Sequence, residues 1–248
     1  MTDYTIAESY TLPSKGLVYE QKVNPNIKIR SMTTEEEMKR LAYSELPYKM
    51  LTEIIDDCLI EKPGIPVYDL CLSDYTFLLH KMRIVTYGSD YKVQHICPYC
   101  GQLNKQTIDL NTLEVSEYSA DMDKYLHITL PQCKKHIDLK LQTPRILDEI
   151  KLNSDERKKK SPDMKSEPAI LFTVVSMIEK VDGEVLDKFK LEAFVRKLSM
   201  RDVNYIAQSI SKISFGIADD VECKCSNCGS NYQIPFPITS EFFGPSID

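Results

Sequence analysis

Two short cysteine motifs that lie far apart in the chain constrain its fold more than any other feature. Residues 95–106 read HICPYCGQLNKQ and residues 221–233 read VECKCSNCGSNYQ, so each motif holds a Cys-x-x-Cys pair followed at once by glycine. A Cys-x-x-Cys turn places two sulfur atoms on one side of a metal ion, and glycine lets the backbone turn sharply after them. Strand-like residues flank both motifs, and each motif therefore predicts one half of a zinc ribbon.

Together the two halves predict one structural zinc ion per chain. Zinc prefers four thiolate or imidazole ligands in a tetrahedron. The long interval between the motifs is no obstacle, because loop-closure entropy grows only logarithmically with loop length. Cys223 and His95 stand two residues before the first cysteine of each pair and are weaker candidate ligands. The predicted ligands are Cys97, Cys100, Cys225 and Cys228.

Other kinds of site fit the sequence less well. Neither cysteine pair opens a helix after a strand, as a redox dithiol motif does. A shell of four cysteines leaves no open position for water, and the sequence lacks HExxH and G-x-S-x-G motifs, so we expect no enzymatic activity. Asp56, Asp57 and Asp74 are expected at helix starts or exposed faces, without a chemical role. The remaining cysteines are expected to pack as small apolar residues: Cys58, Cys71 and Cys133.

Composition narrows the range of partners. The chain has 248 residues, of which 42% are hydrophobic, enough for a sizeable core without disulfides. Its formal net charge of −6 argues against a dedicated binder of duplex nucleic acid. No apolar run approaches the roughly 18 residues that span a membrane, and the first residues do not resemble a signal peptide. We therefore expect no membrane partner, no small-molecule substrate, and a reducing cytoplasm in which the eight cysteines form no disulfide framework.

The order of patterns along the chain predicts an α+β fold, with helical segments around a zinc ribbon whose two knuckles are separated by a long mixed α/β insertion. Apolar alternation predicts strands at 90–96, 104–110, 125–131, 136–142, 218–224 and 231–238. Helical periodicity predicts helices within 33–46, 48–60, 73–88, 144–152, 168–181, 191–199 and 199–213. The expected parts are an extended N-terminal arm (1–31), helices with the first ribbon half (32–115), an inserted hairpin with helices (116–218), and the second ribbon half with a tail (219–248).

Helix caps and one charged segment complete the local predictions. Either Thr33 with Glu36 or Thr34 with Glu37 fits a capping box, Ser73 and Ser199 fit N-caps, and Asp202 follows Ser199 by three residues. Residues 153–168 are polar and contain the basic run 157–160, which is a candidate nucleic-acid contact. Acidic residues interleave with it and no aromatic residue accompanies it, so a solvated loop between helices is the preferred interpretation.

Three ordered segments resemble one protein family. LPSKGLVY at 12–19, MTTEEEMKRL at 32–41 and DYTFLLHKMRIVTYGSDYKVQHICPYCG at 74–101 are similar, in this order, to the baseplate hub family of T-even-type contractile-tailed phages. The resemblance covers roughly residues 9–115, and a weaker similarity continues toward the C-terminus. It implies a non-enzymatic protein that builds the baseplate hub, as a subunit or an assembly factor, through contacts with hub, spike or tape-measure proteins. Its implied location is the host cytoplasm during assembly, or the tail baseplate of the virion.

Partner contacts are predicted on two segments, each with a structural alternative. The N-terminal arm can add to or wrap a partner, in which case a protein lacking residues 1–18 should stay folded and zinc-loaded; equally, the arm can fold onto its own domain. The helix within 73–88 can present aromatic and arginine side chains to a partner, or bury them. The candidate contact residues are Leu12, Pro13, Gly16, Tyr75, Arg83 and Tyr87. The alternatives to the tail function are a zinc-ribbon nucleic-acid adaptor or transcription accessory protein, and an enzyme with an unrecognised site.

Overall fold

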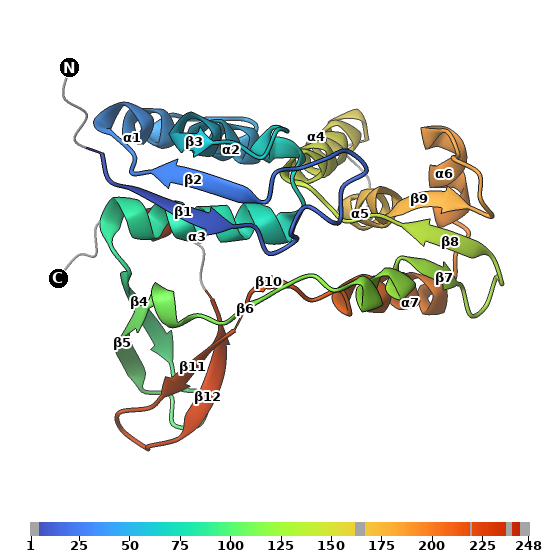
Figure 1. The fold of residues 1–248 in the computed structure, drawn as a ribbon. Helices are drawn as coiled ribbons and strands as arrows, with labels where there is room; N and C mark the ends of the chain where they lie inside the picture. Colours follow the sequence, from blue (N-terminus) through green and yellow to red (C-terminus); the bar gives the residue numbers. More distant parts are fainter. Residues whose placement is uncertain (1–4, 162–166, 219, 237–239, 244–248) are drawn as a thin grey trace.

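The computed structural model describes residues 5–161, 167–218, 220–236 and 240–243, and it has the predicted mixed α+β fold, built on small sheets (Figure 1). Three parts follow from the packing. A first lobe comprises residues 7–87 with 240–243, a second lobe comprises residues 120–213, and two paired hairpins comprise residues 90–109 and 220–235. Buried residues at the base of the hairpins share the core of the first lobe. Figure 1 shows the two lobes next to each other, with the paired hairpins extending from the first lobe.

The first lobe packs helices against a three-stranded antiparallel sheet of order β1-β2-β3. Alternation in β2 buries Ile27 and Ile29 completely, and the apolar face of α2 buries Ile54 and Ile55 with them. The N-terminal residues expected to be an extended arm thus contribute two strands to this sheet. The elements of the first lobe are β1 (Ala7–Thr11), β2 (Asn26–Arg30), α1 (Thr34–Leu41), α2 (Pro47–Cys58), β3 (Leu59–Glu61), the 3-10 turn η1 (Val67–Asp69), α3 (Leu72–Tyr87) and the 3-10 turn η4 (Ser240–Phe243).

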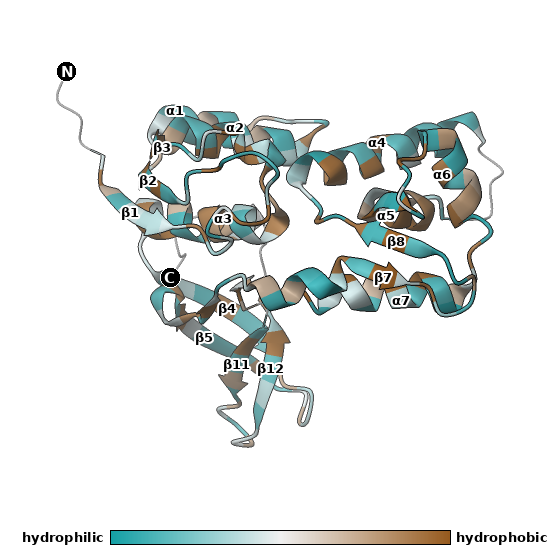
Figure 2. Ribbon diagram, turned by 45° about the vertical axis from the view of Figure 1, so that its right-hand side comes forward, coloured by the Kyte–Doolittle hydropathy of each residue, from teal (hydrophilic) through white to brown (hydrophobic). Residues whose placement is uncertain are grey.

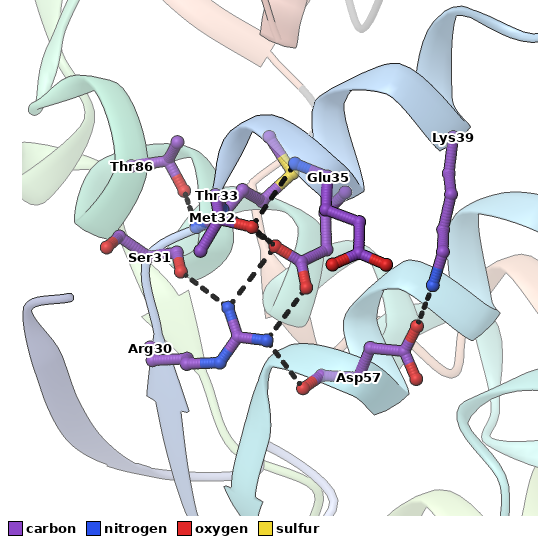
Figure 3. Close-up of polar contacts among 9 residues, drawn as sticks. Arg30, Ser31, Met32, Thr33, Glu35, Lys39, Asp57 and Thr86 are labelled. Carbon is purple, nitrogen blue, oxygen red and sulfur yellow. Dashed lines mark hydrogen bonds and ion pairs between the residues drawn. The ribbon is translucent and has the colours of Figure 1, made fainter. Parts of the chain in front are cut away.

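Arg30, at the end of β2, joins three elements of the first lobe (Figure 3). Its guanidinium donates to a Glu36 carboxylate oxygen at 2.8 Å in α1 and to the Asp57 carbonyl at 3.1 Å in α2. Glu36 also accepts from the Thr33 N–H at 2.7 Å, while the Thr33 hydroxyl caps the helix. The capping box predicted from Thr33 and Glu36 is confirmed. Arg30 and Thr33 together lower the pKa of Glu36 to about 2.

Glu36→Gln should therefore lower the free energy of unfolding at neutral pH by roughly 2 kcal/mol, because the amide keeps the cap acceptor but loses the ion pair. The pKa of Glu36 is depressed in the folded state. Its contribution is thus present above the ordinary glutamate pKa, near 4.5, and is lost as pH falls toward about 2. The difference between wild type and variant, measured by denaturant titration, should shrink across this window.

Glu35→Gln is the matched control for that measurement, because Glu35 lies in the same helical turn but is exposed. It should change stability by no more than about 0.5 kcal/mol. If the stability difference between the wild type and the Glu36→Gln variant stayed constant while the pH was lowered through this window, the carboxylate charge would contribute nothing.

α3 begins at Leu72, and its first turn carries a buried carboxylate. Cys71, not Ser73, occupies the N-cap position, and it makes no side-chain cap bond. Asp74 is completely buried and accepts from the Ser14 N–H at 3.0 Å and the Tyr19 hydroxyl at 2.7 Å, besides the Ser14 hydroxyl. Asp74 lies at a helix start, as expected, but it is buried and has a structural role that the sequence did not indicate. Burial raises its pKa, and the carboxylate fastens the segment after β1 to α3.

The second lobe folds around the antiparallel sheet β7-β8-β9. Hydrophobic α5 lies between the more polar α4 and the sheet in both ribbon views (Figure 2), and it buries Phe172 and Val174. The predicted hairpin at 125–142 and the Ser199 cap of α7 are confirmed. The elements are η3 (Ala120–Tyr125), β7 (His127–Thr129), β8 (His136–Leu139), α4 (Pro144–Lys160), α5 (Ala169–Met177), β9 (Ile178–Val181), α6 (Lys188–Val195) and α7 (Met200–Ser211).

Two predictions within the second lobe are wrong in part. The helix predicted across 168–181 ends at Met177, because residues from Ile178 onward pair with β8 as strand β9. The polar loop predicted at 153–168 is helical up to Lys160, as the last turns of α4; residues 162–166 lie outside the described part of the chain. Arg157 pairs with Glu192 at 3.0 Å, and two lysines of the basic run 157–160 also form ion pairs with acidic side chains. These pairs favour a solvated charged face over a nucleic-acid contact.

Short elements connect the lobes to the hairpins. β6 (Val115–Ser116) pairs antiparallel with β10 (Gly216–Ile217), which also contacts α3. The hairpin strands are β4 (Asp90–Ile96) with β5 (Leu103–Asp109), and β11 (Asp220–Lys224) with β12 (Asn231–Pro235), and η2 (Leu110–Thr112) follows β5. Within the described residues, every helix is too short or too polar to cross a lipid bilayer.

Candidate metal centre

The two cysteine motifs occupy equivalent turns of the paired hairpins. β4 and β5 pair from Asp90 with Asp109 to Ile96 with Leu103, and β11 and β12 pair from Asp220 with Pro235 to Lys224 with Asn231. Each pair of strands is joined by a loop of equal length, 97–102 in the first hairpin and 225–230 in the second. The two loops lie together at the same end of the paired hairpins, which brings their thiols into contact.

The backbone of the two turns matches bond for bond. In the first turn, Cys97 N–H donates to Gln102 C=O at 2.9 Å, and Gly101 N–H donates to Cys97 C=O at 3.0 Å. In the second turn, the Cys225 N–H to Ser230 C=O and Gly229 N–H to Cys225 C=O bonds have the same two lengths. Gly101 and Gly229 have φ angles of 71° and 74°, a left-handed conformation that favours glycine. The glycines after the cysteines are thus required by the turn.

The four sulfur atoms form a cluster of the size a tetrahedral ion requires. All four lie within 4.8 Å of one another; Cys97 and Cys228 are 3.8 Å apart, and Cys100 and Cys225 are 3.6 Å apart. Metal–sulfur bonds of about 2.3 Å in a tetrahedron place the sulfurs about 3.8 Å from each other. A disulfide would need about 2.05 Å, so the four are free thiols. The cluster can therefore hold a metal ion with only small adjustments.

Asparagine side chains support the thiols from the opposite hairpin. Asn104, on β5, accepts from Ser226 N–H and from the Ser226 hydroxyl, both at 3.0 Å, and its amide donates to the Cys225 sulfur at 3.6 Å. Asn227 donates to the Cys100 sulfur at 3.7 Å. Asn104 is 4% exposed, so its bond to the Cys225 sulfur is sheltered from water. Each hairpin thus holds the other's turn in place, a role that no local sequence signal predicted.

Local hydrogen bonds and burial act in opposite directions on the thiol groups. The Cys228 N–H, 3.5 Å from the Cys225 sulfur, lowers the pKa of Cys225 to about 6. The Ser230 hydroxyl lowers the pKa of Cys228. Burial, with the side chain 1% exposed, raises the pKa of Cys97 to about 11. A divalent cation at the centre would lower the pKa of all four groups, because a coordinating thiol is deprotonated outright.

The two alternative ligands stand beside the cluster rather than in it. Cys223 packs with Cys97, Cys225 and Tyr232 in a small buried apolar group. The His95 ring makes an edge contact with the Tyr232 ring, at 5.5 Å between centroids. Neither Cys223 nor His95 belongs to the group of four cysteines whose sulfur atoms converge.

The predicted contact residues on α3 mostly lie in the interior of the chain. Tyr75 is 4% exposed and Arg83 is completely buried, while Tyr87 is half-buried. The Arg83 guanidinium donates to Gly88 C=O at 2.8 Å and to Asp90 C=O at 3.3 Å, where β4 begins. It also lies 5.1 Å from the centre of the Tyr87 ring. Arg83 therefore orients the first hairpin relative to α3, and its contact with a partner stays an untested prediction.

The predicted contact residues near the N-terminus are mostly buried as well. Leu12 is completely buried and Pro13 is buried, so both pack within the first lobe. Gly16 has a φ of 75°, and a Cβ there would lie 2.7 Å from the Val23 carbonyl oxygen, so the turn requires glycine. In this conformation, only Gly16 of the three offers a partner any surface.

The other cysteines behave differently from one another. Cys58 and Cys71 are buried, as predicted, and burial raises the pKa of the Cys58 thiol to about 11 and that of Cys71 to about 12. Cys133 is exposed on the turn between β7 and β8, so its expected burial is wrong. Its N–H instead donates to Asp202 at 3.2 Å, which fastens that turn to α7.

Comparison with known proteins gives a family match. A family model described as "T4 bacteriophage base plate protein" matches residues 5–244, nearly the whole chain. No curated protein and no solved structure matches it significantly.

Proposed function

The chain belongs to the T4 bacteriophage base plate protein family, and we propose that it acts at the hub of the base plate, in assembly or as a structural part, through protein–protein contacts. The family match over residues 5–244 is the observation that carries this proposal, because it includes both lobes and both hairpins. The expected partners are hub, spike or tape-measure proteins of the tail. We further propose that the protein performs this role without catalysis.

Zinc is the ion we propose for the four-cysteine cluster. Soft thiolate ligands in a tetrahedron suit zinc or iron–sulfur chemistry, and four Cys ligands closing one shell are typical of structural zinc. Sulfur separations of 3.6 Å and 3.8 Å support a single ion rather than a larger cluster. Elemental analysis of protein purified without chelator should give one zinc per chain and no stoichiometric iron. Protein with no zinc under these conditions would exclude the proposed ion.

The proposed role of the zinc is to clamp the turn ends of the two hairpins, because at their opposite ends Tyr91, Val93, Ile108 and Val221 already pack in the core of the first lobe. An isolated two-stranded hairpin is marginally stable in water. Here each hairpin contributes two thiols, and only a small apolar group around Tyr232 lies beside them. A closed shell of four thiolates leaves no position for a substrate or an activated water, which supports a structural role.

Asn104→Ala should weaken zinc binding by roughly 10- to 100-fold while leaving the protein folded, because it removes the donor to Cys225 and the acceptor that orients Ser226. The measurement is the transfer of zinc to a chromogenic chelator of known affinity. Gln106→Ala is the matched control, because Gln106 lies on the same face of β5 and its side chain donates one long bond, of 3.5 Å, to the Glu222 carbonyl. Equal zinc affinity in both variants would remove Asn104 from the metal centre.

We propose partner contacts only for candidate residues that are exposed to solvent. Of the six candidates, Gly16 and Tyr87 are partly exposed, and the other four are buried. Contact with a tail protein is therefore proposed at these two positions.

Affinity capture of the tagged protein from infected cells tests the function. Hub, spike or tape-measure proteins should co-purify in amounts that do not depend on nuclease treatment. A phage lacking the gene should fail to form normal base plates. Normal contractile tails in that phage would overturn the proposed function, and tight, salt-dependent binding to DNA would favour the nucleic-acid adaptor instead.

A further inference from the structure

A second group of potential metal ligands lies on the sheet of the second lobe. His127 on β7 and His136 and Asp138 on β8 place one ligand atom each within 4.8 Å of one another. The Nδ1 atom of His127 is 2.8 Å from Oδ1 of Asp138, and the Nε2 atom of His136 is 3.5 Å from the same oxygen. The two imidazoles thus converge on one carboxylate oxygen from neighbouring strands.

The strand register produces this convergence. His127 pairs directly with Asp138 across the β7–β8 ladder, and His136 precedes Asp138 by two residues, so all three lie on one face of the sheet. Asp138 also pairs with Lys180 on β9, which makes β8 the central strand. At the hairpin end, the His136 N–H donates to Asp182 at 2.9 Å, and Lys135 pairs with Asp182 at 2.6 Å. β8, which carries two of the three ligands, is therefore held from both sides.

One hydrogen bond explains only part of this arrangement. The contact of 2.8 Å between Nδ1 of His127 and Oδ1 of Asp138 is an ordinary bond across the strand pair. It gives no reason for Nε2 of His136 to approach the same oxygen at 3.5 Å. A divalent ion between the three groups would give that reason, because imidazole nitrogens and a carboxylate oxygen can bind one ion together.

We propose that His127, His136 and Asp138 form a binding site for a divalent transition-metal ion of the zinc, cobalt or nickel type. Imidazole and carboxylate ligands suit these ions, with bonds of about 2.0 to 2.2 Å. Such bonds place ligand atoms about 3.4 Å apart in a tetrahedron, between the 2.8 Å and 3.5 Å separations present. Only small side-chain rotations are needed, and both imidazoles are about half exposed, which leaves them free to rotate.

This site differs in kind from the four-cysteine cluster. Three protein ligands leave at least one coordination position to water or to a donor from another molecule, whereas four thiolates close the shell. It also lies on the second lobe, away from the paired hairpins, so it does not depend on the proposed function of the thiol site.

Cobalt titration of the purified, zinc-loaded protein tests the proposal. One further equivalent of Co²⁺ should bind per chain, with visible d–d bands and without the sulfur-to-metal charge-transfer absorption that Co²⁺ at a thiolate site would add. His127→Ala and His136→Ala should each weaken this second binding event at least about tenfold, because each removes one of three ligands. Both variants should keep the thiolate-bound ion. Glu184→Gln, at an exposed carboxylate just after β9, should bind Co²⁺ like the wild type.

Histidine NMR signals supply a second readout that does not depend on absorbance. Added Zn²⁺ should shift the ring signals of His127 and His136 and leave that of the buried His80 unchanged. The proposal is overturned if no further equivalent of Co²⁺ binds in large excess. It is also overturned if the double variant His127→Ala/His136→Ala binds the second ion as tightly as the wild type.

Discussion

Cys97→Ser should release the metal ion and unfold the paired hairpins, which is the largest effect we expect from a single substitution. Metal binding in small structural zinc modules contributes on the order of 10 kcal/mol, and hydroxyl oxygen is a poor replacement for thiolate at such a site. Residues 90–109 and 220–235 should then exchange their amide hydrogens rapidly, while the β7-β8-β9 sheet stays protected. Elemental analysis and hydrogen exchange measure the two effects on the same sample.

Cys133→Ser is the matched control, because Cys133 is an exposed thiol outside the cluster. It should keep one zinc per chain and the wild-type exchange pattern. If Cys97→Ser also retains a full equivalent of zinc, another group has replaced the lost ligand. Cys223 and His95, which lie beside the cluster, would then be the first residues to substitute in that background.

Deleting residues 1–18 should destabilise the first lobe severely, in contrast to the outcome expected for a free partner-binding arm. The deletion removes β1 from the sheet and Leu12 from the core, and it takes both Ser14 donors away from the buried Asp74. Loss of a buried leucine costs about 2 to 5 kcal/mol, and a buried carboxylate deprived of donors costs about 1 to 3 kcal/mol more. The sum is a large part of the stability of an ordinary domain. The truncated protein should unfold at much lower denaturant concentration, or accumulate as insoluble protein.

Single substitutions separate the parts of this effect if the truncated protein is insoluble. Ser14→Ala removes the hydroxyl donor to Asp74 and should lower the free energy of unfolding by about 1 to 3 kcal/mol. Ser9→Ala, on the same N-terminal segment but exposed in β1, should change it by less than about 0.5 kcal/mol. A truncated protein that unfolds at the wild-type denaturant midpoint would contradict the structural role of the N-terminal strand.

Local chemistry explains why much of the fold was predictable. Strands β4, β5, β11 and β12 alternate regularly, and the glycines after the cysteine pairs mark their turns. The caps at Thr33 and Ser199 depend on residues within three positions, so the sequence contains the whole signal. The convergence of the four thiols followed from a further rule, the coordination preference of a metal ion, which applies at any sequence separation.

The features that sequence reasoning missed depend on distant partners. Asp148 of α4 is completely buried and accepts from the Lys49 N–H at 2.9 Å, satisfying the start of α2 from 99 residues away. Asp74 and Asp202 accept in the same way from segments 60 and 70 residues before them. Nothing near these carboxylates in the sequence distinguishes them from exposed ones. β9 was missed because its pairing with β8 overrides the helical pattern that leads into it.

The wide separation of the two cysteine motifs also sets an order of events during folding. Contacts in the α1–α2 region and in the β7–β8 hairpin join residues close in sequence and can form early, whereas Cys100 and Cys225 are 125 residues apart. Until the second motif has been synthesised, the first hairpin presents two thiols to an ion that accepts four. An ion bound by the first motif alone would keep two positions open to other ligands until Cys225 and Cys228 arrive. Recovery of folded protein should therefore depend on when metal is supplied during synthesis, as well as on how much is supplied.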